Sequence, residues 1–309
     1  MPLLSFRLLA ARLVVLGLGT LAGSGMADAG WRDDIGTFRI GLVAEAGGNR
    51  TVAGLSTLKQ AYSRALGMPV EIFVARDYAA LIDAQASARV EYAAMSAMAY
   101  AASWQLCNCV EPVAAPVGAD GSIGLRAVIV GRLGALNSVD DIPAHRVAIA
   151  GGDGNAVRAL VVGRLAVAGS VVTGSEPFFM PARDAAEAEA MFASGTVDAI
   201  VGWVPAGPDG ELAGGTLSRL ESLGIPGSEL AVIWKSQLLR HGPHTLRAGL
   251  DPEVGAVLRA FLVGLKELSP DVYDLLERHH AGGFATVTAQ DYSAAVEIVQ
   301  ALAAVQEAE

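Results

Sequence analysis

The sequence is poor in cysteine, in basic residues and in recognisable catalytic motifs. It has two cysteines, and its 22 lysines and arginines face 32 aspartates and glutamates, which leaves a net charge of −10. The basic residues form no cluster beyond the first turn, which argues against a nucleic-acid partner. No H-E-x-x-H, G-x-S-x-G or Walker sequence is present and the histidines are dispersed, so we expect no enzyme, no cofactor and no metal site.

The two cysteines, Cys107 and Cys109, are separated by one residue. Two thiols alone do not form a metal site, and a disulfide across a single residue is strained. We therefore expect two free thiols at the end of a helix, with one or both of them buried.

The first residues have the pattern of an export signal. Arg7 and Arg12 precede an apolar run from Leu13 to Leu21, and Ala27-Asp28-Ala29 follows as an A-x-A cleavage site. The run is shorter than the roughly 20 residues of a membrane span. We expect residues 1–29 to be a cleaved signal peptide and the mature protein to be periplasmic.

The rest of the chain is organised around a stretch that occurs twice. Ala75-Arg76-Asp77 begins one copy and Ala182-Arg183-Asp184 the other, at a constant offset, since 182 − 75 and 197 − 90 both equal 107. In each copy an apolar strand leads to an aspartate that can cap an alanine-rich helix, and a second buried strand follows. The repeat predicts two similar α/β lobes, although chance identities in alanine-rich sequence are an alternative.

We expect a two-lobed fold in which each lobe is a mostly parallel sheet flanked by helices, with a two-strand hinge. Residues 30–126 would form the first part of lobe 1, residues 127–229 lobe 2, and residues 230–309 the return to lobe 1. An apolar strand from Leu125 to Gly131 would carry the chain out, and a strand from Leu230 to Trp234 would bring it back. Pro205 to Gly215 is predicted to be a surface loop. A ligand would then bind in the crevice between the lobes, at the carboxyl ends of the strands.

Several pieces of the sequence resemble the phosphate, phosphite and phosphonate substrate-binding proteins of ABC transporters, over roughly Phe38 to Val299. The matching pieces are Arg39-Ile40-Gly41-Leu42, Asp77-Tyr78-Ala79-Ala80-Leu81-Ile82, Asp120-Gly121-Ser122 with Gly124, Val128-Ile129-Val130, and Val232-Ile233-Trp234-Lys235-Ser236. The resemblance implies a type II periplasmic binding protein that closes on a small ligand and delivers it to a membrane permease.

The chain departs from this family at the ligand loop after the predicted strand from Arg146 to Ala150. The family pattern resembles D-P-x-S-T-S-G, whose hydroxyls hold the phosphonate oxygens. This chain has Gly154-Asn155-Ala156-Val157 in place of S-T-S-G, preceded by Asp153. Since hydroxyl donors are lost and a carboxylate is gained, we expect weak binding of phosphate, phosphite and simple alkylphosphonates.

The candidate ligand-binding residues lie where strands end and helices begin. Asp153 can instead be only a helix cap, and Tyr78 or Trp203 can instead serve packing. The candidates are Glu45, Tyr78, Ser96, Ala97, Asp153, Gly154, Asn155, Trp203 and Lys235.

The leading functional hypothesis is a monomeric solute-binding protein with an ABC permease as its partner. A periplasmic sensor that acts on a signalling partner is an alternative from another class, and an enzyme on the same scaffold is a weaker third.

Overall fold

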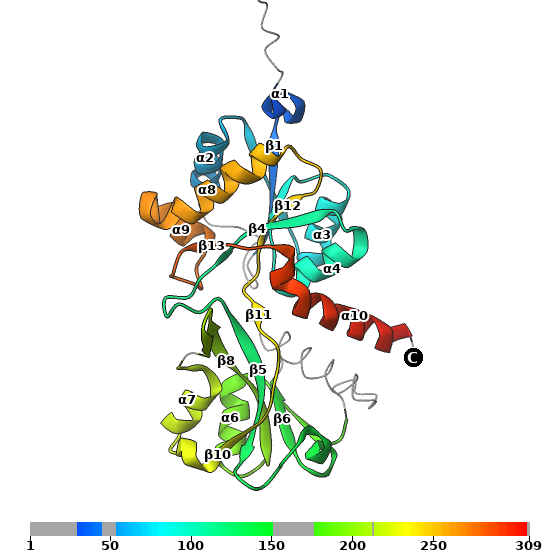
Figure 1. The fold of residues 1–309 in the computed structure, drawn as a ribbon, viewed down its shortest axis with the longest axis vertical. Helices are drawn as coiled ribbons and strands as arrows, with labels where there is room; N and C mark the ends of the chain where they lie inside the picture. Colours follow the sequence, from blue (N-terminus) through cyan, green and yellow to red (C-terminus); the bar gives the residue numbers. More distant parts are fainter. Residues whose placement is uncertain (1–29, 45–53, 151–175, 212, 308–309) are drawn as a thin grey trace, which may run out of the picture.

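The computed structural model describes residues 30–44, 54–150, 176–211 and 213–307. They form two lobes, each built on one sheet with helices on its faces (Figure 1). This confirms the predicted two-lobed α/β fold. The expectation of mostly parallel sheets is wrong, because antiparallel pairings outnumber parallel ones in both sheets.

The first sheet has the strand order β13-β4-β12-β3-β1-β2, in which β1 runs parallel to both β2 and β3. The other pairings are antiparallel. Its strands are β1 (Phe38–Val43), β2 (Val70–Ala75), β3 (Tyr92–Ala94), β4 (Val110–Pro116), β12 (His244–Arg247) and β13 (Phe284–Thr286).

Helices cover both faces of this sheet. One group packs with the core around Phe38 and Tyr62, and the other with the core around Leu81 and Tyr100. The first group lies on the left of the upper lobe in Figure 1 and the second on the right. The first group is α2 (Leu55–Leu66), α8 (Pro252–Leu268) and α9 (Pro270–Leu276); the second is α3 (Tyr78–Ala86), α4 (Ala97–Cys107) and α10 (Ser293–Glu307), preceded by the 3-10 turn η4 (Ala289–Tyr292). The short α1 (Trp31–Ile35) precedes β1.

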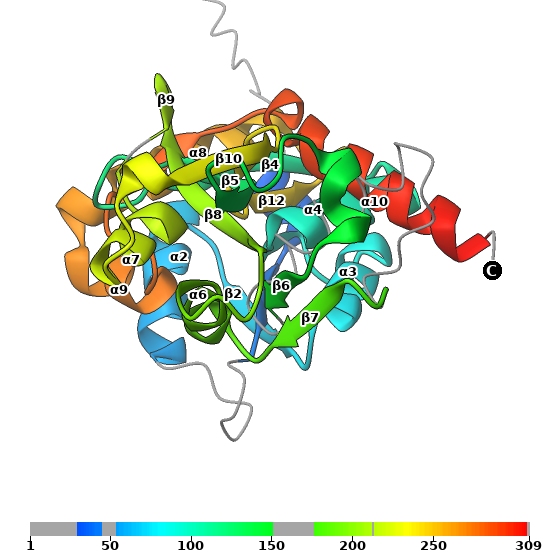
Figure 2. The ribbon, with the colours of Figure 1, turned by 90° about the horizontal axis from the view of Figure 1, so that it is seen from below.

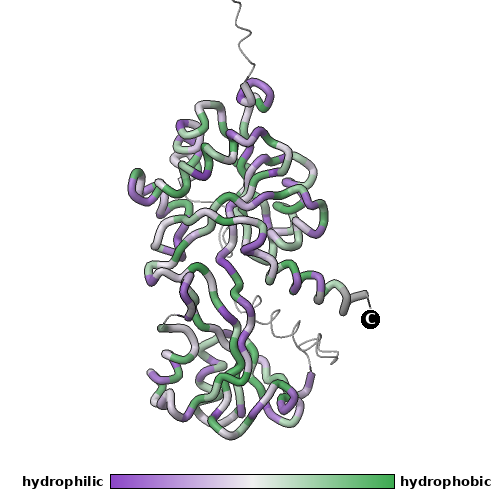
Figure 3. The backbone as a smooth tube through the Cα atoms, in the orientation of Figure 1, coloured by the Kyte–Doolittle hydropathy of each residue, from purple (hydrophilic) through white to green (hydrophobic). Residues whose placement is uncertain are grey.

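The second sheet has the order β10-β5-β8-β6-β7, with β11 paired to β5 and β9 to β8. β5 and β8 consist largely of hydrophobic residues and are buried along most of their length (Figure 3). The strands are β5 (Gly124–Arg132), β6 (Val147–Ala150), β7 (Phe179–Ala182), β8 (Ala199–Gly207), β9 (Gly210–Glu211), β10 (Leu230–Lys235) and β11 (Leu239–Arg240). The described helices beside them are α6 (Ala185–Ala193) and α7 (Gly215–Ser222), with 3-10 turns η1 (Val139–Ala144) and η3 (Gly227–Glu229); α6 and α7 lie together on one side of the sheet (Figure 2).

The chain passes between the two sheets twice, through residues 117–123 after β4 and through residues 241–243 before β12. The return differs from the prediction, because β10 pairs antiparallel with β5 inside the second sheet. Antiparallel pairing with β5 therefore keeps residues 230–235 in the second lobe, and the crossing comes after β11. The predicted loop from Pro205 to Gly215 is also partly regular, since β8 continues to Gly207 and pairs back with β9.

Both copies of the repeat have the same local construction. The carboxylate of Asp77 accepts a hydrogen bond from the Ala80 N–H, and that of Asp184 accepts one from the Glu187 N–H. Capping of this kind satisfies an N–H that has no partner within the helix. The predicted cap positions are thus confirmed in both lobes.

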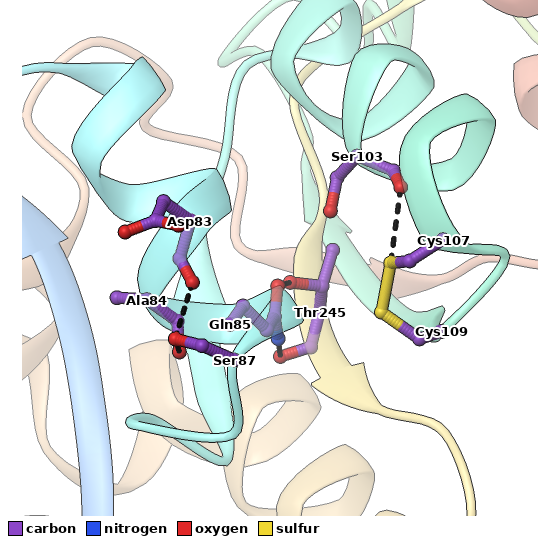
Figure 4. The surroundings of a disulfide bond; sticks show 8 residues. All are labelled: Asp83, Ala84, Gln85, Ser87, Ser103, Cys107, Cys109 and Thr245. Carbon is purple, nitrogen blue, oxygen red and sulfur yellow. Dashed lines mark hydrogen bonds between the residues drawn. A yellow bond between two sulfur atoms is a disulfide. The ribbon is translucent and has the colours of Figure 1, made fainter.

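The cysteines do not form the two free thiols that we expected. Cys107 ends α4 and is joined by a disulfide to Cys109 (Figure 4). Asn108 between them adopts a left-handed conformation with φ of 47°, which turns the chain back and places the two Cα atoms 5.0 Å apart. This separation lies within the usual disulfide range.

No helix in the described ranges combines the length and the apolar character needed to cross a membrane.

Candidate ligand-binding site

A cavity of about 370 Å³ lies in the first lobe, at the carboxyl ends of β1 and β3. Its wall includes Val43 at the end of β1, Ala94 at the end of β3, and residues beside both crossings, Pro116 and Gly242. The carboxyl edge of a sheet is the usual ligand position in open α/β folds. The cavity therefore lies where the lobes are connected.

Two helices begin at this cavity. Tyr78 is the first residue of α3, and Ser96 is the N-cap of α4, where its hydroxyl accepts a hydrogen bond of 3.1 Å from the Ala99 N–H. The first N–H groups of a helix have no intrahelical partner, and the helix dipole makes this end favourable for negative charge. Tyr78 is 42% exposed as a residue, but partial desolvation of its hydroxyl is the main cause that raises the pKa of this group.

The opposite wall comes from the segment that follows α9, and it carries a carboxylate. Glu277 Oε1 accepts hydrogen bonds from the His279 N–H (2.8 Å), the His280 N–H (3.1 Å) and the His280 ring Nδ1 (3.1 Å). Burial alone raises the pKa of Glu277, but the bonds from His280 and His279 outweigh it and lower the pKa below its ordinary value. Glu277 is therefore ionised at neutral pH.

Two histidines beside Glu277 are neutral at pH 7. Burial lowers the pKa of His244 to about 4, and burial together with the nearby His280 lowers the pKa of His241 to about 4. The His241 and His280 rings are in contact, with their centroids 3.9 Å apart and their planes inclined by 48°. His244 Nδ1 is hydrogen-bonded to the Tyr92 hydroxyl, which lies 2.7 Å from the Tyr62 hydroxyl.

Gly242 brings the return crossing into direct contact with the start of α4. A Cβ at this position would lie 2.1 Å from the Met95 carbonyl oxygen and 2.7 Å from the Ser96 Cα. Since both are backbone atoms, a larger residue cannot be accommodated without moving the crossing. Glycine thus allows the crossing to form part of the cavity wall.

Residues 40–292 match the profile of a protein family described as the phosphonate periplasmic substrate-binding protein of ABC transporters. The chain belongs to this family. Family membership implies that it binds a small ligand in the periplasm and delivers it to an ABC permease. It does not support the signalling alternative.

Solved structures agree with this fold. XAC2383 from Xanthomonas citri, bound to chloride ion, is 14% identical with a TM-score of 0.58, over 89% of this chain and 100% of that one. PhnD1 from Prochlorococcus marinus, in complex with methylphosphonate, is 14% identical with a TM-score of 0.50, over 87% of this chain and 98% of that one. At these identities the likeness concerns the fold alone. No curated protein sequence matches the chain.

The structure brings only some of the predicted site residues of this family member together. Tyr78 and Ser96 line the cavity, whereas Ala97 is buried in the first turn of α4 and does not line it. Four other candidates lie outside the described residues: Glu45, Asp153, Gly154 and Asn155.

Trp203 and Lys235 lie in the second lobe and do not line this cavity. The Arg219 guanidinium lies over the Trp203 ring at 5.0 Å from its centroid, and the Trp203 N–H donates to Thr216 Oγ1. Lys235 forms an ion pair with Glu211 of β9. A ligand-binding role of Trp203 and Lys235 stays a prediction.

Sequence reasoning missed the polar wall formed by His244, Glu277 and His280. The Glu-x-x-His spacing from Glu277 to His280 was an available signal, because residues three apart at a helix end can interact. Within the described part of the chain, no group of three or more histidine, cysteine, aspartate or glutamate side chains is arranged to hold a metal ion.

Proposed function

We propose that this protein captures a small organic oxyanion, phosphonate-like in shape, in the first-lobe cavity and closes the second lobe over it. The observation that carries the proposal is the position of the cavity, which is bounded by the starts of α3 and α4 and by both crossings. Helix N-termini favour an anion, and two narrow connections permit hinge rotation. The protein would bind without chemistry of its own, as a monomer, after cleavage of residues 1–29.

The charge of the cavity favours a ligand that is not a bare dianion. Glu277 is an ionised carboxylate in the cavity wall, and a like charge within about 4–6 Å disfavours a second negative group. This supports the expectation from the altered 154–157 loop that phosphate and methylphosphonate bind weakly. A ligand with a less charged head, or one that carries its own amine or metal, fits better.

Isothermal titration calorimetry with phosphate, methylphosphonate, methanesulfonate and 2-aminoethylphosphonate tests this proposal. We expect binding of at least one organic oxyanion and a smaller radius of gyration by small-angle scattering in its presence. Micromolar binding of plain phosphate or methylphosphonate would contradict the expected weak binding of these ligands. An unchanged radius of gyration at saturation would contradict the hinge closure.

The variant Ser96→Ala tests whether the ligand binds in the described cavity. Loss of an N-cap costs about 1 kcal/mol of stability, so Asp184→Ala, which removes the equivalent cap of α6 in the second lobe, is a matched control. We expect Ser96→Ala to weaken ligand binding about tenfold, as for one lost hydrogen bond to a charged group, and Asp184→Ala to leave it unchanged. Equal affinities of the two variants for the ligand would show that the ligand does not bind at the start of α4.

A further inference from the structure

The C-terminal segment lies against the return crossing between the lobes. α10 packs along α4 of the first lobe, and η4 lies beside β11, where the chain leaves the second sheet (Figure 1). The Tyr292 hydroxyl of η4 donates a hydrogen bond of 2.9 Å to the carbonyl oxygen of His241, in the crossing itself. Gln237, which precedes β11, donates through Nε2 to Glu297 Oε2 of α10 at 3.4 Å. The C-terminal segment therefore holds the end of the second lobe and the crossing at two points.

Apolar packing accompanies these two hydrogen bonds. Leu239 of β11 is 4% exposed and shares one hydrophobic core with Tyr292 of η4 and Ile298 of α10. The Tyr292 ring also packs against the Tyr100 ring of α4, with their centroids 4.8 Å apart. The same core continues into the second sheet and includes Ile129 of β5. Because apolar surfaces that separate are exposed to water, this core resists rotation of the second lobe away from η4 and α10.

The same junction buries three polar atoms that have no hydrogen-bond partner. They are Tyr100 Oη, Arg240 Nε and His241 Nε2. A buried polar atom without a partner has lost its hydrogen bonds to water, so it favours an arrangement in which water or another group can reach it. Two hydrogen bonds and apolar packing thus hold the crossing in place, while the unpaired atoms oppose them. Opposing contributions of this kind are suited to an element that switches between two arrangements.

We propose that η4 and α10 form a latch on the return crossing. The latch holds the lobes in the described arrangement and releases residues 237–241 when the second lobe rotates. In the released arrangement, Tyr292 and Glu297 no longer bind the crossing, and His241 becomes accessible to water. The inference goes beyond ligand capture, because it concerns the balance between lobe arrangements in the free protein.

The test measures the distance between the lobes in the mature protein without added ligand, by double electron–electron resonance. Nitroxide labels are attached to Gln60→Cys in α2 and Ser222→Cys in α7, two exposed positions in different lobes. Cys107 and Cys109 are joined in a disulfide and do not take the label.

Two variants open the latch by different routes. Tyr292→Phe keeps the ring in the core but removes the bond to His241, and we expect the ratio of released to latched molecules to rise about fivefold, as for one hydrogen bond. Glu297→Ala removes the exposed bond to Gln237 without touching the core, and the ratio should rise about twofold. If Tyr292→Phe does not fold, Glu297→Ala decides the test.

Matched controls remove similar groups outside the latch. Ser63→Ala removes a hydroxyl that donates to the Met68 carbonyl oxygen within the first lobe, at 2.6 Å. Gln300→Ala shortens an exposed side chain on α10 itself. Both controls should keep the wild-type distance distribution. An unchanged distribution in both latch variants, or an equal change in the controls, would overturn the inference.

Hydrogen exchange followed by mass spectrometry shows whether the crossing itself is released. We expect the amides of residues 236–243 to exchange about fivefold faster in Tyr292→Phe than in the wild type. Faster exchange without any change in the distance between the lobes would mean that η4 and α10 only order the crossing locally, and this result would overturn the latch.

Discussion

The two copies of the repeat form the same frame in the two lobes but present different residues at the ends of their strands. The shared offset extends to an ion pair, because Arg39 pairs with Glu91, Arg146 pairs with Asp198, and 146 − 39 and 198 − 91 both equal 107. In contrast, Tyr78 and Ser96 of the first copy line the cavity, while the same offset leads to Ala185 and Trp203 in the second. The frame is repeated, and the binding chemistry is not.

The equivalent ion pairs also differ in burial. Glu91 is 2% exposed and accepts hydrogen bonds from the Arg39 N–H (2.8 Å) and Nε (3.1 Å). Asp198 is 35% exposed and accepts one from the Arg146 N–H at 2.9 Å. The same pairing in the two copies should therefore contribute differently to stability, because Glu91 is buried and Asp198 is partly exposed.

The largest expected effect comes from removing these carboxylates. Breaking a buried ion pair costs about 3–5 kcal/mol, because a charged group loses its partner, whereas exposed pairs contribute about 1 kcal/mol or less. Since Arg39 is itself partly exposed, we expect Glu91→Ala to lower the free energy of unfolding by about 3 kcal/mol and Asp198→Ala by about 1 kcal/mol. Urea denaturation followed by circular dichroism measures both, and equal losses would show that burial does not separate the two pairs.

The second effect concerns pH and the histidines of the first-lobe cavity. The pKa of His244 is about 4 in the folded protein and about 6.5 when unfolded, so the unfolded state binds more protons between these values. Stability should therefore fall as the pH drops through this window, by about 2 kcal/mol between pH 7 and pH 5 for His244 and similarly for His241. Glu277, whose pKa is lowered, loses its contribution only at lower pH.

Urea denaturation at pH 7 and pH 5 measures this dependence, and His244→Gln should reduce the difference by about 2 kcal/mol. A difference that His244→Gln leaves unchanged would mean that the proton uptake occurs elsewhere.

The smallest effect concerns the turn after the repeated helix. Ala88 has a φ of 57° in the first copy, and the equivalent position in the second copy is Gly195, with a φ of 76°. The left-handed conformation costs about 1 kcal/mol for alanine but little for glycine. We expect Ala88→Gly to raise the free energy of unfolding by about 1 kcal/mol and Gly195→Ala to lower it by about the same amount. The melting temperature should rise and fall accordingly.

A Cβ at Gly195 meets no atom within 4 Å, so its substitution tests the backbone alone. Calorimetry measures both variants, and shifts of the same sign would contradict this explanation.

Much of the fold was predictable because its signals are local. Helix α2 ends at Leu66, before Gly67 in a left-handed C-cap, and a glycine at this position is a stop signal that the sequence shows directly. The capping aspartates and the return of the repeat after 107 residues are likewise visible without tertiary contacts. Strand partners are less local, and β10 was placed in the wrong lobe because an apolar strand fits either sheet equally well by sequence.

Only one side of the cavity was predictable, because only that side is formed by local sequence signals. Tyr78 and Ser96 follow strands at helix starts, a position that the sequence reveals. The opposite wall comes from His244 and Glu277, about 150 to 200 residues further along the chain, and only folding brings it to the starts of α3 and α4. Trp203 and Lys235 have an equally suitable position by sequence, but they lie in the second lobe, where they contact Arg219 and Glu211 and do not line the described cavity.

The sequence by itself determined a repeated α/β frame, since caps, glycine stops and hydrophobic spacing act over a few residues. The tertiary structure decided which copy of that frame carries the described cavity and what chemistry the cavity has. Burial keeps His244 neutral at pH 7, and hydrogen bonds from the His279–His280 turn keep Glu277 ionised. Both properties depend on desolvation and on partners distant in the chain, which local sequence patterns do not encode.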